Sequence, residues 1–170
     1  MKDTRKLIVV IALAVLNVGI AFAESYIPAP VSTMPFVKFE ISLWVAMLAM
    51  LLYGVGEAIL VYGVKCLVMG LILQSPSLII FTLVGGAVGL AVMFVCLLVK
   101  MGNLPASLLC GVGYILGYYS MVAALNANGI VFSTFPQAAL LIAGFCLLGG
   151  VGCHFAAKYI PRKWITSLAQ

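Results

Sequence analysis

Hydrophobic residues form long, nearly uninterrupted runs along this chain, and short segments rich in glycine, proline and polar residues separate them. Runs of this kind are typical of membrane-spanning helices, whereas the strands of a membrane barrel alternate apolar and polar residues. The pattern predicts an all-α integral membrane protein with one domain, residues 1–170. Its six-helix bundle is expected at about residues 7–23, 39–53, 57–73, 78–99, 106–125 and 137–157.

The breaks between the runs predict how the helices are connected. Residues 24–37 hold three of the seven prolines and predict an ordered loop after the first helix. Gly54-Val55-Gly56 predicts a tight turn, and residues 126–136 predict a second long loop. The second and third runs are short for a bilayer, which needs about 20 residues. We therefore expect these two helices to be tilted, or shielded by the proline-rich loop.

The first run permits a second interpretation. It ends in Ala21-Phe22-Ala23, which resembles a signal-peptidase site, and three basic residues precede it. The run is long for the core of a signal peptide, so we interpret it as the first membrane helix.

Charge is scarce and is distributed unevenly. The chain is 65% hydrophobic and 8% charged, which excludes a soluble domain. Six helices place both termini on one side of the membrane, and seven of the nine basic residues fall on that side: Lys2, Arg5, Lys6, Lys100, Lys158, Arg162 and Lys163. By the positive-inside rule this predicts a multi-pass protein of a bacterial cell membrane with cytoplasmic termini. The basic residues are not clustered with aromatic ones, so nucleic acid is not an expected partner.

The acidic residues and cysteines give no sign of catalysis. Asp3, Glu24, Glu40 and Glu57 are too few and too scattered for a magnesium-dependent transferase, and no phosphate-binding loop is present. The five cysteines lie in apolar runs without C-x-x-C spacing. We expect a protein that is not an enzyme and that has no metal or cofactor.

Lys65 is the most informative residue, because it lies within the apolar stretch Ala58 to Leu73. A lysine at the centre of a bilayer costs about 2.5–3.5 kcal/mol on insertion scales. Two interpretations stay open: an internal partner, Glu40 or helix carbonyls, or a polar cavity where Lys65 meets an anionic or carbonyl group of a ligand. Tyr62 and Met69 would share its helix face. Further candidates for substrate binding are Lys38, Glu40, Trp44, Tyr118, Asn126, Asn128 and Gln137.

The first helix carries two stripes of small residues. Ala14, Asn17 and Ala21 form one, and Gly19 with Ala23 forms the other. Small residues at this spacing allow another helix to approach closely. Two stripes exceed what packing within one bundle needs, so Ala14, Gly19, Ala21 and Ala23 are candidates for a partner interface.

Several short segments together resemble the substrate-binding S-components of energy-coupling factor (ECF) transporters. The similarity is to the Gx transporter family, often labelled heptaprenyl diphosphate synthase component I. It extends over residues 7–157. The matching segments are Glu24-Ser25-Tyr26-Ile27-Pro28, Val37-Lys38, Tyr53-Gly54, Glu57-Ala58, Lys65 with Gly70, Gly85-Gly86, Val92-Met93 and Val122-Ala123-Ala124-Leu125.

The resemblance implies a six-helix bundle that captures a small molecule from outside, either vitamin-like or similar to a flavin or quinone precursor. It also implies partners: a transmembrane T-component and two ATPase subunits, within membrane lipid. The alternative is a non-transport membrane subunit that anchors a redox or isoprenoid/quinone-related complex. The synthase label conflicts with the shortage of carboxylates, so it is not taken as a catalytic activity.

Overall fold

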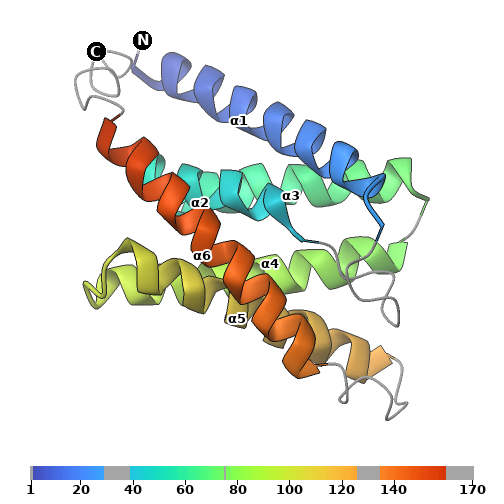
Figure 1. Cartoon of the computed structure of the whole chain (residues 1–170). Helices are drawn as coiled ribbons and strands as arrows, with labels where there is room; N and C mark the ends of the chain where they lie inside the picture. Colours follow the sequence, from blue (N-terminus) through green and yellow to red (C-terminus); the bar gives the residue numbers. More distant parts are fainter. Residues whose placement is uncertain (1, 29–38, 75, 126–134, 160–170) are drawn as a thin grey trace.

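The computed structural model describes residues 2–28, 39–74, 76–125 and 135–159, which form helices and short connections without a strand (Figure 1). The all-helical prediction is confirmed for this part of the chain. The helices are α1 (Lys2–Ser25), α2 (Ile41–Tyr53), α3 (Val55–Ile72), α4 (Pro76–Leu98), α5 (Asn103–Leu125) and α6 (Phe135–Tyr159).

Five helices, all except α2, are long and apolar enough to cross a membrane. The 13 residues of α2 span about 20 Å at 1.5 Å per residue, which is less than the hydrocarbon core. A multi-pass membrane protein is therefore supported, with five candidate spans and one shorter apolar helix.

The turn between α2 and α3 is tighter than the sequence pattern predicts. Gly54 alone separates the two helices, whereas Val55 and Gly56 already belong to α3. Gly54 has a φ of 114°, which side chains rarely permit, and its N–H donates to the carbonyl of Met50 at 3.0 Å. The long helices extend slightly past their predicted ends: α1 begins at Lys2 and α6 ends at Tyr159.

The short helix α2 is the innermost element of the bundle. It contacts α1, α3 and α6, while α3 also contacts α4, and α5 lies between α4 and α6. The first turn of α1 and the last turn of α6 lie at the same end of the bundle (Figure 1). Because α2 is surrounded, a polar group at its beginning lies inside the protein.

Glycines allow α4 and α5 to pack closely. A Cβ added at Gly89 would lie 2.8 Å from the carbonyl oxygen of Cys110, and one at Gly117 would lie 2.9 Å from the Val88 side chain. Such close approach is typical of membrane helices joined through small residues. At this contact Tyr114 of α5 lies against Gly85 and Gly89 of α4.

Candidate functional site

Glu40 lies immediately before α2 and is 5% exposed. Its backbone has φ 54° and ψ 40°, a left-handed conformation that is unfavourable for a residue with a side chain. Its carbonyl accepts the N–H of Leu43 at 2.9 Å, so the helix starts there. Because of this conformation α2 begins at Ile41 and not at residue 39, where the apolar run predicts the start of the helix.

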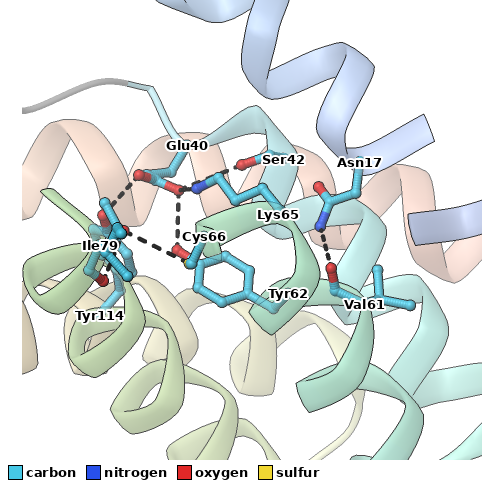
Figure 2. A network of polar contacts seen from close by, with 10 residues as sticks. Asn17, Glu40, Ser42, Val61, Tyr62, Lys65, Cys66, Ile79 and Tyr114 are labelled. Carbon is cyan, nitrogen blue, oxygen red and sulfur yellow. Dashed lines mark hydrogen bonds and ion pairs between the residues drawn. The ribbon is translucent and has the colours of Figure 1, made fainter. Parts of the chain in front are cut away.

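Four side chains donate hydrogen bonds to the Glu40 carboxylate (Figure 2). Oε2 accepts from Lys65 Nζ at 2.9 Å, from Tyr62 Oη at 3.2 Å and from Ser42 Oγ at 3.4 Å. Oε1 accepts from Tyr114 Oη at 2.7 Å. Glu40, Ser42, Tyr62, Lys65 and Tyr114 form what we call the Glu40 cluster. It joins α2, α3 and α5 through one buried anion.

Lys65 is therefore paired inside the protein, with Glu40 as its partner. Its Nζ also lies 4.7 Å from the centroid of the Tyr62 ring, within range of a cation–π contact. Lys65 is ten residues from the start of α3, about 15 Å along the helix, so the pair is far from either end. The sequence leaves Glu40 and helix carbonyls open as internal partners of Lys65, and in the structure the partner is Glu40. Tyr62 and Met69 are buried on the same face, as expected.

Glu24, near the end of α1, is a second buried carboxylate beside this cluster and is also 5% exposed. Its carboxyl group accepts the backbone N–H groups of Glu40 and Ile41 and lies close to the charged groups of Glu40 and Lys65. It thereby caps the start of α2, which lacks a side-chain cap of its own. Its Oε1 has no hydrogen-bond partner in the described part of the chain.

Sequence reasoning did not select Glu24 as a site residue. No two of the four acidic residues have a short catalytic spacing, and Glu24 and Glu40 are far apart in the chain. One feature of the sequence does indicate Glu24: it is one of only four acidic residues, and it lies at the end of an apolar helix.

The other predicted site residues lie in different surroundings. Tyr118 is 4% exposed and stacks with Tyr114 at 6.1 Å between ring centroids, so it borders the cluster. Trp44 packs its indole against Gly149 of α6, away from the cluster's residues. Gln137 is exposed at the start of α6. Lys38, Asn126 and Asn128 lie outside the described residues.

An apolar groove of about 170 Å³ runs between α1 and α6, with α2 as its floor. Its lining residues are Ile20, Ile41, Trp44, Val45, Leu48, Gly149, Gly152, Cys153 and Ala156. None of them carries a charge, and none belongs to the Glu40 cluster. The groove and the cluster are separate features, and the polar chemistry lies in the cluster.

The two small-residue stripes of α1 have different environments. Ala14, Asn17 and Ala21 are buried within the chain, and Asn17 Nδ2 donates to the carbonyl of Val61 in α3 at 3.2 Å. Gly19 and Ala23 are exposed, and a Cβ added at Gly19 would meet nothing within 4 Å. The first stripe packs α1 onto α3, whereas the second one is exposed.

Cysteine and histidine add no further site. All five cysteines are free and buried. Across residues 2–28, 39–74, 76–125 and 135–159, no group of three or more histidine, cysteine or acidic residues is placed to hold a metal ion. His154 Nδ1 lies 3.4 Å from Asn103 Nδ2, a contact between the end of α6 and the start of α5.

Comparison with known proteins gave no match: no protein-family model, curated protein or solved structure is similar enough to this chain. The resemblance to S-components therefore rests on the sequence segments named above.

Proposed function

We propose that this chain is the substrate-binding S-component of an ECF-type importer, with cytoplasmic termini. It would capture a small vitamin-like, flavin-like or quinone-precursor-like compound from outside the cell. The observation that carries the proposal is the Glu40 cluster, a hydrogen-bonded ion pair buried among three apolar helices.

Stability alone does not explain a buried ion pair at this position. Removing two charges from water costs several kcal/mol per ion, and well-packed apolar residues often stabilise a protein as well or better. Ionisable groups inside membrane proteins therefore more often mark a binding site or a pathway. Lys65, Tyr62 and Tyr114 are held at fixed positions by one carboxylate, which is the preorganisation that ligand binding needs.

The cluster's place in the chain agrees with entry from one end of the bundle. Glu40 ends the connection that links α1 to α2, and Glu24 stands where that connection begins. Ser42 Oγ, at 3.4 Å, makes the longest of the four contacts with Glu40 and is the one that a ligand group replaces most easily.

Gly19 and Ala23 supply the proposed contact with the T-component. They are exposed on α1, and small residues one turn apart let a second membrane helix approach closely. Ala14 and Ala21 would support this contact from inside by holding α1 on the bundle.

Affinity purification of the tagged full-length chain from native membranes tests the assembly. The proposal expects two ATPases and a second multi-pass membrane protein to be recovered, and Gly19→Leu to reduce that recovery. Gly144→Leu is the matched control, because Gly144 is another exposed helical glycine with nothing within 4 Å of an added Cβ. Recovery of redox enzymes without ATPases would overturn the proposal and favour the anchoring subunit.

A further inference from the structure

The innermost helix, α2, is open to its surroundings along the apolar groove between α1 and α6. Between Ile41 and Met50, the partly exposed residues are Ile41, Trp44 and Leu48, and all three line this groove. Their spacing of three and four residues places them on one face of the helix. The groove is therefore the place where this part of α2 meets whatever surrounds the bundle.

Small residues of α6 keep the groove open. Gly149, Gly152 and Cys153 line it, again at spacings that belong to one helix face. A Cβ added at Gly149 would lie 2.3 Å from the indole ring of Trp44, whereas one at Gly152 would meet nothing within 4 Å. The groove is therefore open beside Gly152, and a larger side chain at that position would occupy it.

The size and chemistry of the groove favour a hydrocarbon chain. Its lining residues are uncharged and apolar, so a water molecule would find few of the two to four polar partners that it needs. The lining on α2 runs from Ile41 to Leu48, about 10 Å along the helix axis. Over this length a second helix, about 10–12 Å across, would need roughly five times the 170 Å³ of the groove. A single acyl chain is narrow enough.

A peptide segment is a poor occupant. The groove lies between two helices that are long and apolar enough to cross a membrane, so its opening faces hydrocarbon. An extended peptide there would leave its backbone N–H and C=O groups without partners. Residues 160–170, which follow α6, are long enough to return to the groove, but they would have the same cost.

One end of the groove lies toward the start of α1. Glu57, at the beginning of α3, pairs with Lys6 of α1, so α2 ends beside the start of α1. The last turn of α6 lies at the same end of the bundle (Figure 1). Leu48 and Ala156, the last lining residues of α2 and α6, therefore mark the end of the groove on this side.

Positive charge is concentrated at this end of the bundle. Lys2 and Arg5 belong to the first turn of α1, and Lys158 belongs to the last turn of α6. Lys158 is exposed and forms no ion pair with any residue of the described ranges. Arg162 and Lys163 follow α6 in the sequence. Basic residues at the ends of membrane helices attract the head groups of anionic lipids.

We propose that the groove holds one acyl chain of an anionic phospholipid, whose head group lies at the start of α1 and the end of α6. The lipid belongs to the leaflet on the side of these two helix ends. Its chain completes the packing around α2, where α6 supplies only small side chains. This inference goes beyond the proposed transport function and does not depend on it.

Fluorescence quenching by brominated lipids tests the site, because bromine on an acyl chain quenches a tryptophan ring that it contacts. The chain has two tryptophans, Trp44 and Trp164, so Trp164→Phe leaves Trp44 as the only reporter. The full-length protein is placed in phosphatidylcholine vesicles that contain brominated phosphatidylglycerol or brominated phosphatidylcholine. We expect the anionic lipid to quench Trp44 at a mole fraction at least about fivefold lower, which corresponds to about 1 kcal/mol, the contribution of one basic residue.

Two glycines of α6 provide a matched pair of variants. Gly152→Leu fills the groove and should abolish the stronger quenching by the anionic lipid. Gly144→Leu should leave it unchanged, because Gly144 is also exposed, has nothing within 4 Å of an added Cβ and does not line the groove. Equal quenching in the two variants would mean that Trp44 reports lipid outside the groove, and would overturn the inference. Equal quenching by the two brominated lipids would overturn it without any change in the groove.

Discussion

Glu40 and Lys65 are 25 residues apart in the chain, yet their side chains form an ion pair of 2.9 Å in the interior of the bundle. The pair forms because the left-handed backbone at Glu40 starts α2 deep inside the protein, level with the middle of α3. Had the apolar run continued as a helix through residue 39, the carboxylate would stand closer to the end of the bundle. The residue at which α2 begins thus determines where the buried carboxylate of Glu40 lies.

Removing one member of the pair should destabilise the protein strongly. We expect Lys65→Met to lower the free energy of unfolding by about 3–5 kcal/mol, because it leaves Glu40 charged and buried without its ion-pair partner. The double variant Lys65→Met/Glu40→Gln should recover much of the loss. Unfolding in mixed micelles, analysed as a double-mutant cycle, measures both effects.

The pair between Lys6 and Glu57 provides the matched control for that experiment. Its side chains are 42% and 24% exposed, so the same double substitution there should change stability by no more than about 1 kcal/mol. Equal losses from the two pairs would contradict the claim that burial makes the Glu40 pair important.

Tyr114 makes the shortest hydrogen bond to Glu40, at 2.7 Å. Tyr114→Phe should therefore cost about 1–3 kcal/mol of stability, the usual range when a buried charged acceptor loses a donor. Tyr118→Phe in the neighbouring ring should cost less, because no hydrogen bond from Tyr118 to Glu40 is present among the described residues. Thermal unfolding of the two purified variants compares them, and the reverse order would argue against the cluster as described.

Gly86 of α4 gives space to the ring of Tyr62. A Cβ added there would overlap that ring, so Gly86→Ala should shift Tyr62 away from Glu40 and destabilise the protein by about 1–3 kcal/mol. Gly144→Ala, where an added Cβ meets nothing within 4 Å, should be neutral or slightly stabilising. Similar stability of the two variants would mean that Tyr62 does not need this space.

The proposed orientation is accessible to labelling in intact cells. Gln74 and Lys100 are both exposed, both have positive φ, and they flank α4 at opposite ends. With cytoplasmic termini, Gln74→Cys should react with a membrane-impermeant maleimide and Lys100→Cys should not. The five native cysteines are buried, which keeps the background low. If only Lys100→Cys were labelled, the termini would lie outside the cell and the proposed orientation would be wrong.

The helices could be predicted from the sequence because apolar runs of sufficient length have one stable form in lipid. The end of α2 at Tyr53 agrees with the prediction, but its start at Ile41 instead of residue 39 depends on the left-handed backbone of Glu40, which no glycine or proline in the sequence indicates. The pairing of Glu40 with Lys65 was one of several open possibilities, and choosing among them requires the relative depth of α2 and α3. Tyr114 and Glu24 were missed because their roles arise from the packing of α5 and α1 around α2.

Native mass spectrometry of the full-length chain, purified in mild detergent, tests the central claim most directly. The claim is that a small solute binds at the Glu40 cluster. We predict a small molecule retained by the wild-type protein and by Lys6→Met/Glu57→Gln, and lost from the folded Lys65→Met/Glu40→Gln variant. No retained molecule in the wild type, or equal retention in both double variants, would contradict the account.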